Sequence, residues 1–261
     1  MTKKSRYLLA QELVSQANEI CLKQRQKKHH FSQKEDIGHE ILSETDLKVN
    51  ELILSSISKS FPEDKIISEE SANKPGESEY AWIIDPIDGT NNFVRGLPNF
   101  ATAIACTFKD QPLFSVIGAP QLNIFAKAYL NKGTFVNGKR VKVSAKKTLA
   151  TSFVAFDLGH KGRGKNIITP FSHLVDQCRY MFCYGSYSVS MIYLAMGKID
   201  GYVHNNSCGI WDVLPGGLLV TEAGGLVSNA KGGKIEFESR SVLDSVSSNK
   251  LIHDQLIVNI D

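Results

Sequence analysis

The residues with the clearest chemical potential lie in the segment Trp-Ile-Ile-Asp-Pro-Ile-Asp-Gly-Thr-Asn-Asn-Phe at 82–93. Its apolar start predicts a buried strand that ends at Asp85, and the carboxyl ends of strands are where α/β proteins bind ligands. Asp85 and Asp88 lie three residues apart on a turn, so both carboxylates can converge on one point. Two carboxylates held together repel each other, and a hard divalent cation relieves that repulsion. The segment therefore predicts a cation site, although an aspartate-rich turn without a ligand has the same sequence features.

The next two residues, Gly89 and Thr90, add a second chemical feature. If a helix begins there, their backbone N–H groups have no partner within the helix and face outward. Such groups bind anions, and phosphate is the common example. The turn thus predicts a cation site beside a phosphate site.

Two further acidic segments strengthen this prediction. Glu69 and Glu70 follow the short apolar strand Ile66-Ile67-Ser68. Asp212 follows Trp211 and opens an apolar helix, whose end is predicted by Gly224-Gly225. On its own, Asp212 is better explained as a helix N-cap.

Together these motifs resemble the inositol monophosphatase family. The similarity is carried by Asp-Pro-Ile-Asp-Gly-Thr-x-Asn-Phe at 85–93 and Trp-Asp-x-x-x-Gly-x-x-x-x-x-Glu-Ala-Gly-Gly at 211–225, and it extends from about Lys34 to Ser248. This family belongs to the lithium-sensitive, magnesium-dependent phosphatases, which include fructose-1,6-bisphosphatases and 3′-phosphoadenosine-phosphate phosphatases. Two separate motifs are far more specific than one short match. The resemblance implies an α/β fold of alternating helix and sheet layers (αβαβα).

The resemblance also implies roles for individual residues. Two or three Mg²⁺ ions would be held by Glu69, Asp85, the carbonyl of Ile87, Asp88 and Asp212. The phosphate would bind the N–H groups of Gly89 and Thr90. The Thr90 hydroxyl, paired with Asp46, would orient the attacking water, and Glu70 would support the metal-bound waters. Asp46 is also compatible with a plain helix cap, and it could serve both purposes.

The implied reaction is hydrolysis of a small polyol or sugar phosphate, of the inositol monophosphate type, by direct attack of a metal-activated water. All candidate ligands are oxygen atoms, which favours Mg²⁺, with Mn²⁺ as a substitute, over zinc. Inhibition by Li⁺ is expected from the family. The expected partner is a small phosphorylated metabolite, with no nucleic acid required for the reaction.

The second half of the chain departs from the family pattern around the expected substrate-binding residues Gly185, Ser186, Tyr187 and His204. His204 stands where inositol-specific members carry Glu; it cannot replace the two acceptor oxygens and, if protonated, would favour an anionic substrate. Tyr187 is bulky where the family has small residues, so it either stacks on a base or fills the core. The basic loop at 159–165 is either exposed and flexible or a clamp for a second phosphate.

These departures leave alternatives open. The first is a substrate with two anionic groups, such as fructose 1,6-bisphosphate, 3′-phosphoadenosine 5′-phosphate or NADP. Against it, Asn92-Phe93 resembles the inositol monophosphatases rather than the nucleotide-specific branch. The second is an additional protein- or RNA-binding role in transcription complexes, as a bacterial relative has, for which the basic stretch Lys23–His30 would be the first candidate.

The elements that must position these residues fall into two groups. Helices are expected at 7–21 and from 45 to 60, followed by strands at 65–68, 81–84, 101–108, 113–117 and 124–129 and a hairpin around Asn137-Gly138. After about Ala150, strands at 152–156, 180–183 and 199–203 alternate with helices at 167–177, 186–196 and 211–223. Residues 1–150 are thus expected to form a metal- and phosphate-binding subdomain, and 151–261 a second one that supplies Asp212 and the specificity residues.

The composition is that of a globular protein of 261 residues with a net charge of +3, which is too small to indicate nucleic acid or an anionic membrane as the main partner. No run approaches the roughly 18 apolar residues of a membrane span, and the start does not resemble a secretory signal. Five widely spaced cysteines favour a reduced, cytoplasmic protein. Family members are commonly homodimers, for which the apolar stretches 100–106 and 180–190 would serve if exposed.

Overall fold

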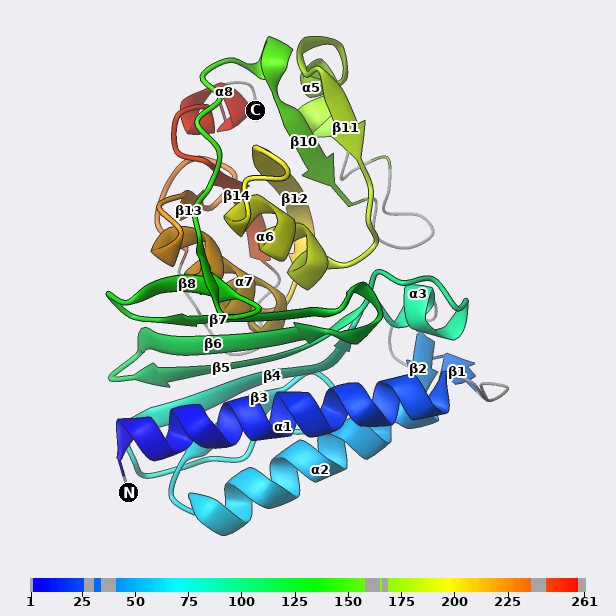
Figure 1. Cartoon of the computed structure of the whole chain (residues 1–261), viewed down its shortest axis with the longest axis vertical. Coiled ribbons are helices and arrows are strands. Elements are labelled where there is room, and N and C mark those ends of the chain that lie inside the picture. Colours follow the sequence, from blue (N-terminus) through cyan, green and yellow to red (C-terminus); the bar gives the residue numbers. More distant parts are fainter. Residues whose placement is uncertain are drawn as a thin grey trace.

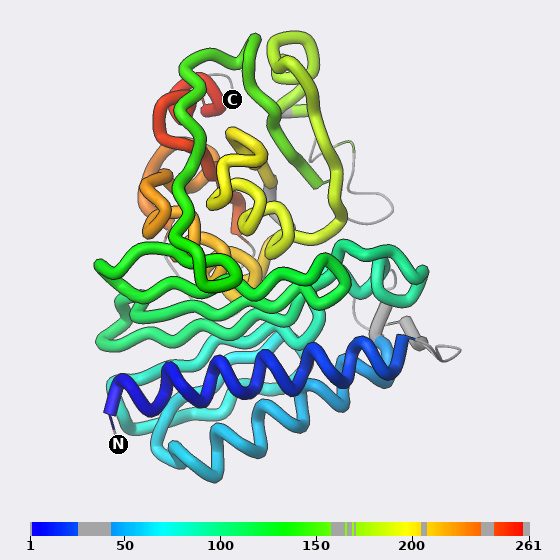
Figure 2. Tube along the Cα trace, viewed as in Figure 1, coloured from blue at the N-terminus to red at the C-terminus, as the bar shows by residue number. Residues whose placement is uncertain are grey.

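The computed structural model describes residues 2–25, 31–33, 41–157, 165, 169–235 and 243–257. The elements stack in five layers in the order αβαβα (Figure 1). These layers are a pair of helices, a sheet, a second pair of helices, a second sheet and a third pair of helices. This confirms the layered α/β fold expected from the sequence. The N-terminus lies at the outer helix layer and the C-terminal end at the opposite end of the stack (Figure 2).

The first layer consists of α1 (Lys3–Gln24) and α2 (Glu44–Ser60). Both helices begin with a capping box, in which the side chain of the N-cap residue and that of the third helical residue each accept a backbone N–H. The apolar faces of α1 and α2 pack on one face of the first sheet. The predicted helices at 7–21 and 45–60 are thereby confirmed. A short strand pair, β1 (Phe31–Gln33) with β2 (Ile41–Ser43), was not predicted.

The first sheet has seven strands in the order β3-β4-β5-β6-β7-β8-β9, antiparallel except for the parallel pair β3–β4. Its strands are β3 (Lys65–Ser68), β4 (Tyr80–Asp88), β5 (Ala101–Phe108), β6 (Gln111–Ala119), β7 (Ile124–Tyr129), β8 (Gly133–Val136) and β9 (Lys139–Val141). Every strand predicted in this region is present, and Asn137-Gly138 forms the predicted hairpin turn. Short helical turns occupy Thr90–Val94 (α3) and Pro120–Leu122.

The second sheet has five strands in the order β11-β10-β12-β14-β13. They are β10 (Phe153–Phe156), β11 (Tyr180–Phe182), β12 (Gly201–Cys208), β13 (Leu226–Ser228) and β14 (Leu243–Ser248). The strands β13 and β14 and the last helix, α8 (His253–Ile257), were not predicted, because short strands with serine at alternate positions give little hydrophobic signal.

Two helices fill the space between the sheets, namely α6 (Tyr187–Ala195) and α7 (Ile210–Glu222). Both are apolar on nearly all sides, as expected for helices covered by a sheet on each face. Beyond the second sheet lie α5 (Ser172–Gln177) and α8, which pack on its outer face. No helix within the described residues is long and apolar enough to cross a membrane.

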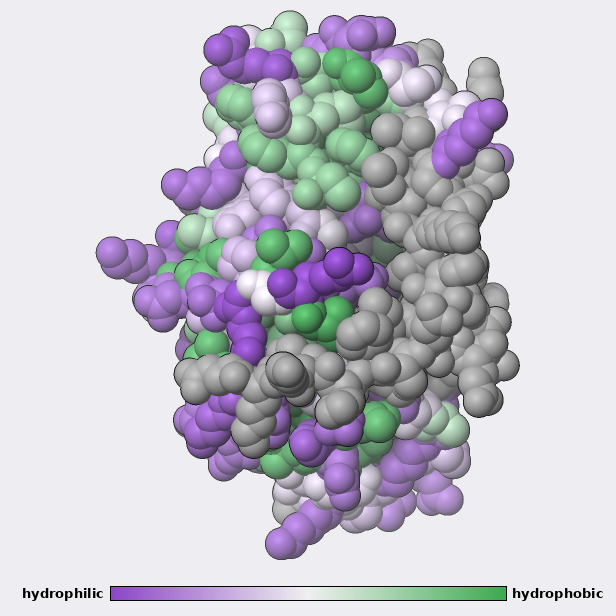
Figure 3. Space-filling model, turned by 90° about the vertical axis from the view of Figure 1, so that its right-hand side faces the viewer, coloured by the Kyte–Doolittle hydropathy of each residue, from purple (hydrophilic) through white to green (hydrophobic). Residues whose placement is uncertain are grey.

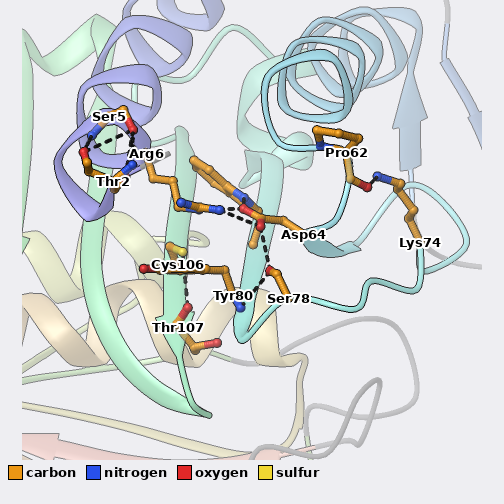
Figure 4. A network of polar contacts seen from close by, with 11 residues as sticks. Thr2, Ser5, Arg6, Pro62, Asp64, Lys74, Ser78, Tyr80, Cys106 and Thr107 are labelled. Atoms are coloured by element: carbon orange, nitrogen blue, oxygen red, sulfur yellow. Dashed lines mark hydrogen bonds and ion pairs between the residues drawn. The ribbon is translucent and has the colours of Figure 1, made fainter.

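A buried ion pair joins the first helix to the first sheet (Figure 4). Arg6 of α1 donates two hydrogen bonds of 2.7 Å to Asp64, which also accepts from Ser78 and from the indole N–H of Trp82. Burial by itself raises the pKa of Asp64, but these hydrogen bonds and the charge of Arg6 outweigh it and the pKa is lowered. The rings of Phe61 and Tyr80 lie within 4.3 Å of the guanidinium carbon.

The two apolar stretches considered for a dimer differ in exposure. Residues 100–106 are buried in the first sheet, so this stretch does not meet the condition of exposure under which it would serve as an interface. At 180–190, Tyr180 is exposed but 186–190 are buried. Figure 3 shows hydrophobic residues gathered on the upper part of the face that carries β10, β11 and α5, where Val175 and Tyr180 are more than half exposed. Any apolar surface from this stretch is therefore limited to its beginning.

Two segments considered as functional fall largely outside the described residues. Of the basic loop at 159–165 only Lys165 is described, and of the stretch 23–30 only residues 23–25. Neither the clamp nor the binding role suggested for them is tested by the structure.

Candidate active site

The centre of the site is the carboxyl end of β4. Residues alternate between the two faces of this strand, so Trp82 and Ile84 face α1 and α2 whereas Ile83 and Asp85 face α7. The pairing of β4 with β5 is irregular between Asp85 and Asp88, and this irregularity allows both carboxylates to reach the same side.

The helix α7 brings the third carboxylate to the same place. Its first turn packs on β3, β4 and β5 through Ile210 and Leu214. The N-cap of α7 is Gly209 rather than Asp212; Asp212, the third residue of the helix, accepts the backbone N–H of Gly209 at 2.6 Å and so caps the helix from inside its first turn. Carboxylate oxygens of Asp85, Asp88 and Asp212 all lie within 4.8 Å of one another. The structure thus brings together three residues from distant parts of the sequence, and the cap interpretation does not exclude the ligand interpretation.

Electrostatics confirm how crowded this cluster is. Burial raises the pKa of Asp85 well above its ordinary value, and the charges of Glu69, Asp88, Asp212 and Glu70 raise it further. Among the described residues, Asp85 Oδ1 has no hydrogen-bond partner although it is fully buried. A buried carboxylate oxygen without a partner is costly unless a cation binds it. The set of oxygen donors therefore fits a hard divalent cation.

Asp88 is held differently from Asp85. Its carboxylate accepts the hydroxyl of Ser186 at 2.9 Å, the N–H of Tyr187 at 3.1 Å and the N–H of Ser188. Burial raises the pKa of Asp88 to about 6, and these hydrogen bonds limit the rise. The N-terminus of α6, where unpaired N–H groups favour a negative charge, thus fixes Asp88 from the second half of the chain.

Glu69 and Glu70 lie directly after β3. The N–H of Glu69 donates to the carbonyl of Ile84 at 3.2 Å, which continues the pairing of β3 with β4 up to the acidic residues. Ser68, just before them, donates to Asn50 of α2 at 2.8 Å. Both glutamates act on the pKa of Asp85, so they belong to the same acidic group.

The pair of Thr90 and Asp46 lies beside this group. The Thr90 hydroxyl is 3.1 Å from Asp46 Oδ1 and 2.9 Å from the carbonyl oxygen of Ile87. Asp46 also accepts the N–H of Ser43 at 3.1 Å, so it helps to cap α2 and contacts Thr90 at the same time. Burial raises the pKa of Asp46 to about 6, and the hydrogen bonds from Ser43 limit this rise. Because the hydroxyl has one hydrogen, it can donate to only one of its two neighbours, and its lone pairs remain available to a water molecule.

Gly89 forms a tight turn at the start of α3. Its φ of +83° is a left-handed conformation, and a Cβ here would lie 2.8 Å from the carbonyl oxygen of Asn99. Asn92 holds the opposite side of this turn, since its amide donates to the carbonyls of Tyr184 at 2.8 Å and Asn99 at 2.7 Å. The segment 89–99 is therefore pinned against Gly185, whose φ is +65°.

The structure bears on the alternatives left open for two specificity residues. The Tyr187 side chain is 4% exposed, and its hydroxyl lies 2.9 Å from that of Ser245 on β14, so it fills the core and cannot stack on a base. His204 is also buried, and burial lowers its pKa despite the charge of Asp157. This direction disfavours the protonated form, on which the attraction of an anionic substrate by His204 depends.

Three contacts that support the site were not predicted from the sequence. Ser43 caps α2 around Asp46, Ser188 binds Asp88 through its N–H, and Asn92 joins the turn to the segment before α6. A signal for Ser188 was present, because a predicted helix at 186–196 has free N–H groups in its first turn. No local pattern predicts the contacts of Asn92, which depend on segments about ninety positions apart.

Comparisons with known proteins agree with this geometry. A family model described as the inositol monophosphatase family matches residues 3–260. The chain is 31% identical over 247 residues to inositol monophosphatase 2 of Solanum lycopersicum, covering 90% of this chain and 91% of that protein. It is 33% identical over 217 residues to the Nus factor SuhB of Pasteurella multocida, covering 78% of this chain and 79% of that protein. The solved structure of an IMPase from Thermotoga maritima superposes with a TM-score of 0.87 at 28% identity, covering 98% of this chain and 96% of that one.

Proposed function

Because the chain belongs to the inositol monophosphatase family and is therefore a phosphoric monoester hydrolase, we propose that it hydrolyses a small polyol or sugar phosphate of the inositol monophosphate type with Mg²⁺ as its metal. The family is metal-dependent. The observation that carries the proposal is the convergence of Asp85, Asp88 and Asp212 within 4.8 Å, next to an unpartnered carboxylate oxygen.

The residues that would hold Mg²⁺ are Glu69, Asp85, the carbonyl of Ile87, Asp88 and Asp212. When bound, two or three Mg²⁺ ions would neutralise the phosphate and make water at the site more acidic. Mn²⁺ would substitute, since it also prefers oxygen ligands, and Li⁺ would inhibit.

The chain's own residues would then bind and orient the reactants. The N–H groups of Gly89 and Thr90 would hold the phosphate oxygens at the start of the turn. The lone pairs of the Thr90 hydroxyl, with its hydrogen donated to Asp46, would accept a hydrogen from the attacking water and aim it at phosphorus. Glu70 would fix further waters, and Gly185 and Ser186 would lie at the edge of the substrate site, with Ser186 acting through Asp88.

Several finer properties belong to the same proposal. Two subdomains, 1–150 and 151–261, would share the site, which is supported by the separate sheets in these ranges. A homodimer is proposed from family membership, and a cytoplasmic location from the five free cysteines. An additional role in transcription complexes is supported by the similarity to the Nus factor of Pasteurella multocida.

The test is phosphate release with and without Mg²⁺, and with added Li⁺. The substrates are inositol 1-phosphate, fructose 1,6-bisphosphate, 3′-phosphoadenosine 5′-phosphate, NADP and glycerol 2-phosphate. We expect Mg²⁺-dependent release that is greatest with inositol 1-phosphate and absent from the Asp85→Asn variant. Preference for a substrate with two anionic groups would replace the substrate class but keep the reaction. No release from any of them, with Mg²⁺ binding shown by calorimetry, would contradict the proposal.

A further inference from the structure

The net charge of +3 hides a strong local separation of charge. Residues 111–156 contain seven lysines and arginines and no aspartate or glutamate. This range includes the edge strand β9 and the extended connection that runs from β9 to the second sheet. In Figure 1 that connection passes along the outside of the molecule from the first sheet to β10. The positive charge therefore follows a path that spans both sheets.

The basic side chains of this path point outward. Along the chain, Val141 and Val143 turn inward and pack on the core between the sheets. Arg140 and Lys142 alternate with them and are exposed, as the period of two in extended chain requires. The N–H of Val143 donates to the carbonyl of Ala223 at 3.1 Å, which fixes this orientation.

Neighbouring loops extend the same surface. Gly197 packs its backbone on Ser144, which places Lys198 beside the connection. The Asn249 amide donates to the Lys146 carbonyl at 2.8 Å, which brings Lys250 to it. The Arg140 guanidinium covers Gly133, next to Lys132. We call this surface the linker stripe; it consists of the exposed residues Lys132, Lys139, Arg140, Lys142, Lys146, Lys147, Lys198 and Lys250.

In the described part of the chain, the carboxylates near the linker stripe bind backbone groups rather than its cations. None of its eight cations forms an ion pair with a described carboxylate. Glu222 is nearby but accepts the N–H groups of residues 131–133, and Asp200 is buried and accepts the N–H of Phe153. Gln255 of α8 donates to the Lys147 carbonyl, and its neighbour in sequence, Asp254, is exposed. Asp254 forms no ion pair with a described lysine of the linker stripe. Lysines often protect an edge strand from pairing, but only Lys139 and Arg140 lie on β9.

We propose that the linker stripe binds the phosphate backbone of a nucleic acid duplex. The segment from Lys139 to Lys147 has eight residue steps and so reaches up to about 27 Å, which is far longer than a metabolite. A duplex offers a row of negative charges at this scale. The apolar side chains of the segment face inward, so no anchor is present for insertion into a bilayer. The segment from Lys139 to Lys147 contains no aromatic residue, which argues against base stacking and for contacts to phosphate alone.

The test uses fluorescence anisotropy of a labelled 20-base-pair DNA duplex between 50 and 200 mM KCl. In the stripe variant, Lys139, Lys146 and Lys147 are changed to Gln. In the control variant, Lys4, Lys48 and Lys59 on α1 and α2 are changed to Gln, which alters the net charge equally. We expect the stripe variant to bind at least ten-fold more weakly, with a salt slope smaller by about 3, and the control to bind within two-fold of the wild type.

Three results would overturn the proposal. The first is an equal loss of binding in both variants, which would indicate general charge attraction. The second is no salt-dependent binding of the wild-type protein to the duplex. The third is stripe-dependent binding to vesicles containing phosphatidylglycerol that is tighter than binding to the duplex, which would indicate a membrane surface. Phosphate release should be unchanged in both variants, because no residue of the linker stripe belongs to the acidic site.

Discussion

The hydroxyl of Ser186 donates to Asp88 at 2.9 Å, and this bond joins residues 98 positions apart. Asp88 ends a strand of the first sheet, and Ser186 caps α6, which lies between the sheets. The second half of the chain therefore determines where a carboxylate of the first half points. Ser186 is accordingly a positioning residue for the acidic site.

Replacing Ser186 with Ala should weaken metal activation. The change removes one hydrogen bond to Asp88 and the N-cap of α6, which together cost about 1–3 kcal/mol. We expect the Mg²⁺ concentration for half-maximal activity to rise at least five-fold, and Ser186→Thr, which keeps the hydroxyl, to retain most of the affinity. Calorimetric titration with Mg²⁺ checks the same effect without turnover. A lower Tm with unchanged metal affinity would show that Ser186 only caps the helix.

Asp85→Asn and Asp88→Asn should differ in stability although both abolish turnover. One carboxylate oxygen of Asp85 has no hydrogen-bond partner among the described residues, and the surrounding carboxylates repel its charge. Replacing Asp85 with the neutral Asn should therefore raise the Tm of the metal-free protein. Asp88 accepts three hydrogen bonds, and an amide NH₂ group would face donors, so Asp88→Asn should lower it. Thermal unfolding in EDTA at pH 7.5 makes the comparison. Equal shifts of the two variants would contradict this account.

Gly89→Ala should abolish most activity through the shape of the turn. A Cβ at this position would lie 2.8 Å from the Asn99 carbonyl oxygen, and the φ of +83° is strained for alanine by roughly 1–2 kcal/mol. Gly138→Ala is the matched control, because its φ is +78° but a Cβ there meets nothing within 4 Å. We expect kcat/KM to fall more than ten-fold for the first variant and to stay unchanged for the second. Similar activities would mean that the turn does not shape the phosphate site.

Tyr187→Phe should affect stability and leave substrate binding unchanged. The variant removes the hydroxyl that pairs with Ser245 in the core, which costs about 1 kcal/mol. Urea unfolding should show the loss, while KM for the preferred substrate stays within two-fold. A large rise in KM at unchanged stability would restore the interpretation of Tyr187 as a substrate contact.

Asp64→Asn should destabilise the protein in a manner that depends on pH. The pKa of Asp64 is lowered in the folded state, so its ionised form adds stability at every pH above the unfolded value of about 3.9. That contribution is lost as the pH falls through the lower folded value. The urea midpoint of the variant should therefore lie well below that of the wild type at pH 7 and pH 5. The difference should shrink below pH 4, and a constant difference would show that the charge of Asp64 is not responsible.

The sequence predicted the first half of the fold well because its signals are local. The apolar segment 101–108 and the Asn137-Gly138 turn each determine their own element. In the same way, Asp85 and Asp88 are close in sequence and could be assigned together. The contacts that were missed, such as Asn92 with Tyr184, depend on how α6 docks against the first sheet. For the same reason the sequence does not determine the pKa of His204, since its burial is set by packing rather than by its neighbours in sequence.

The position of Asp212 has a consequence for the order in which the protein is synthesised. A nascent chain that has emerged only as far as residue 150 contains Asp85 and Asp88, but neither Asp212 nor the N–H groups that fix Asp88. Such an intermediate has an incomplete cation site with strong internal repulsion, so on the proposed function we expect it to hold the metal less tightly than the finished protein. We then expect metal capture to wait until α7 has left the ribosome and both halves have folded against each other.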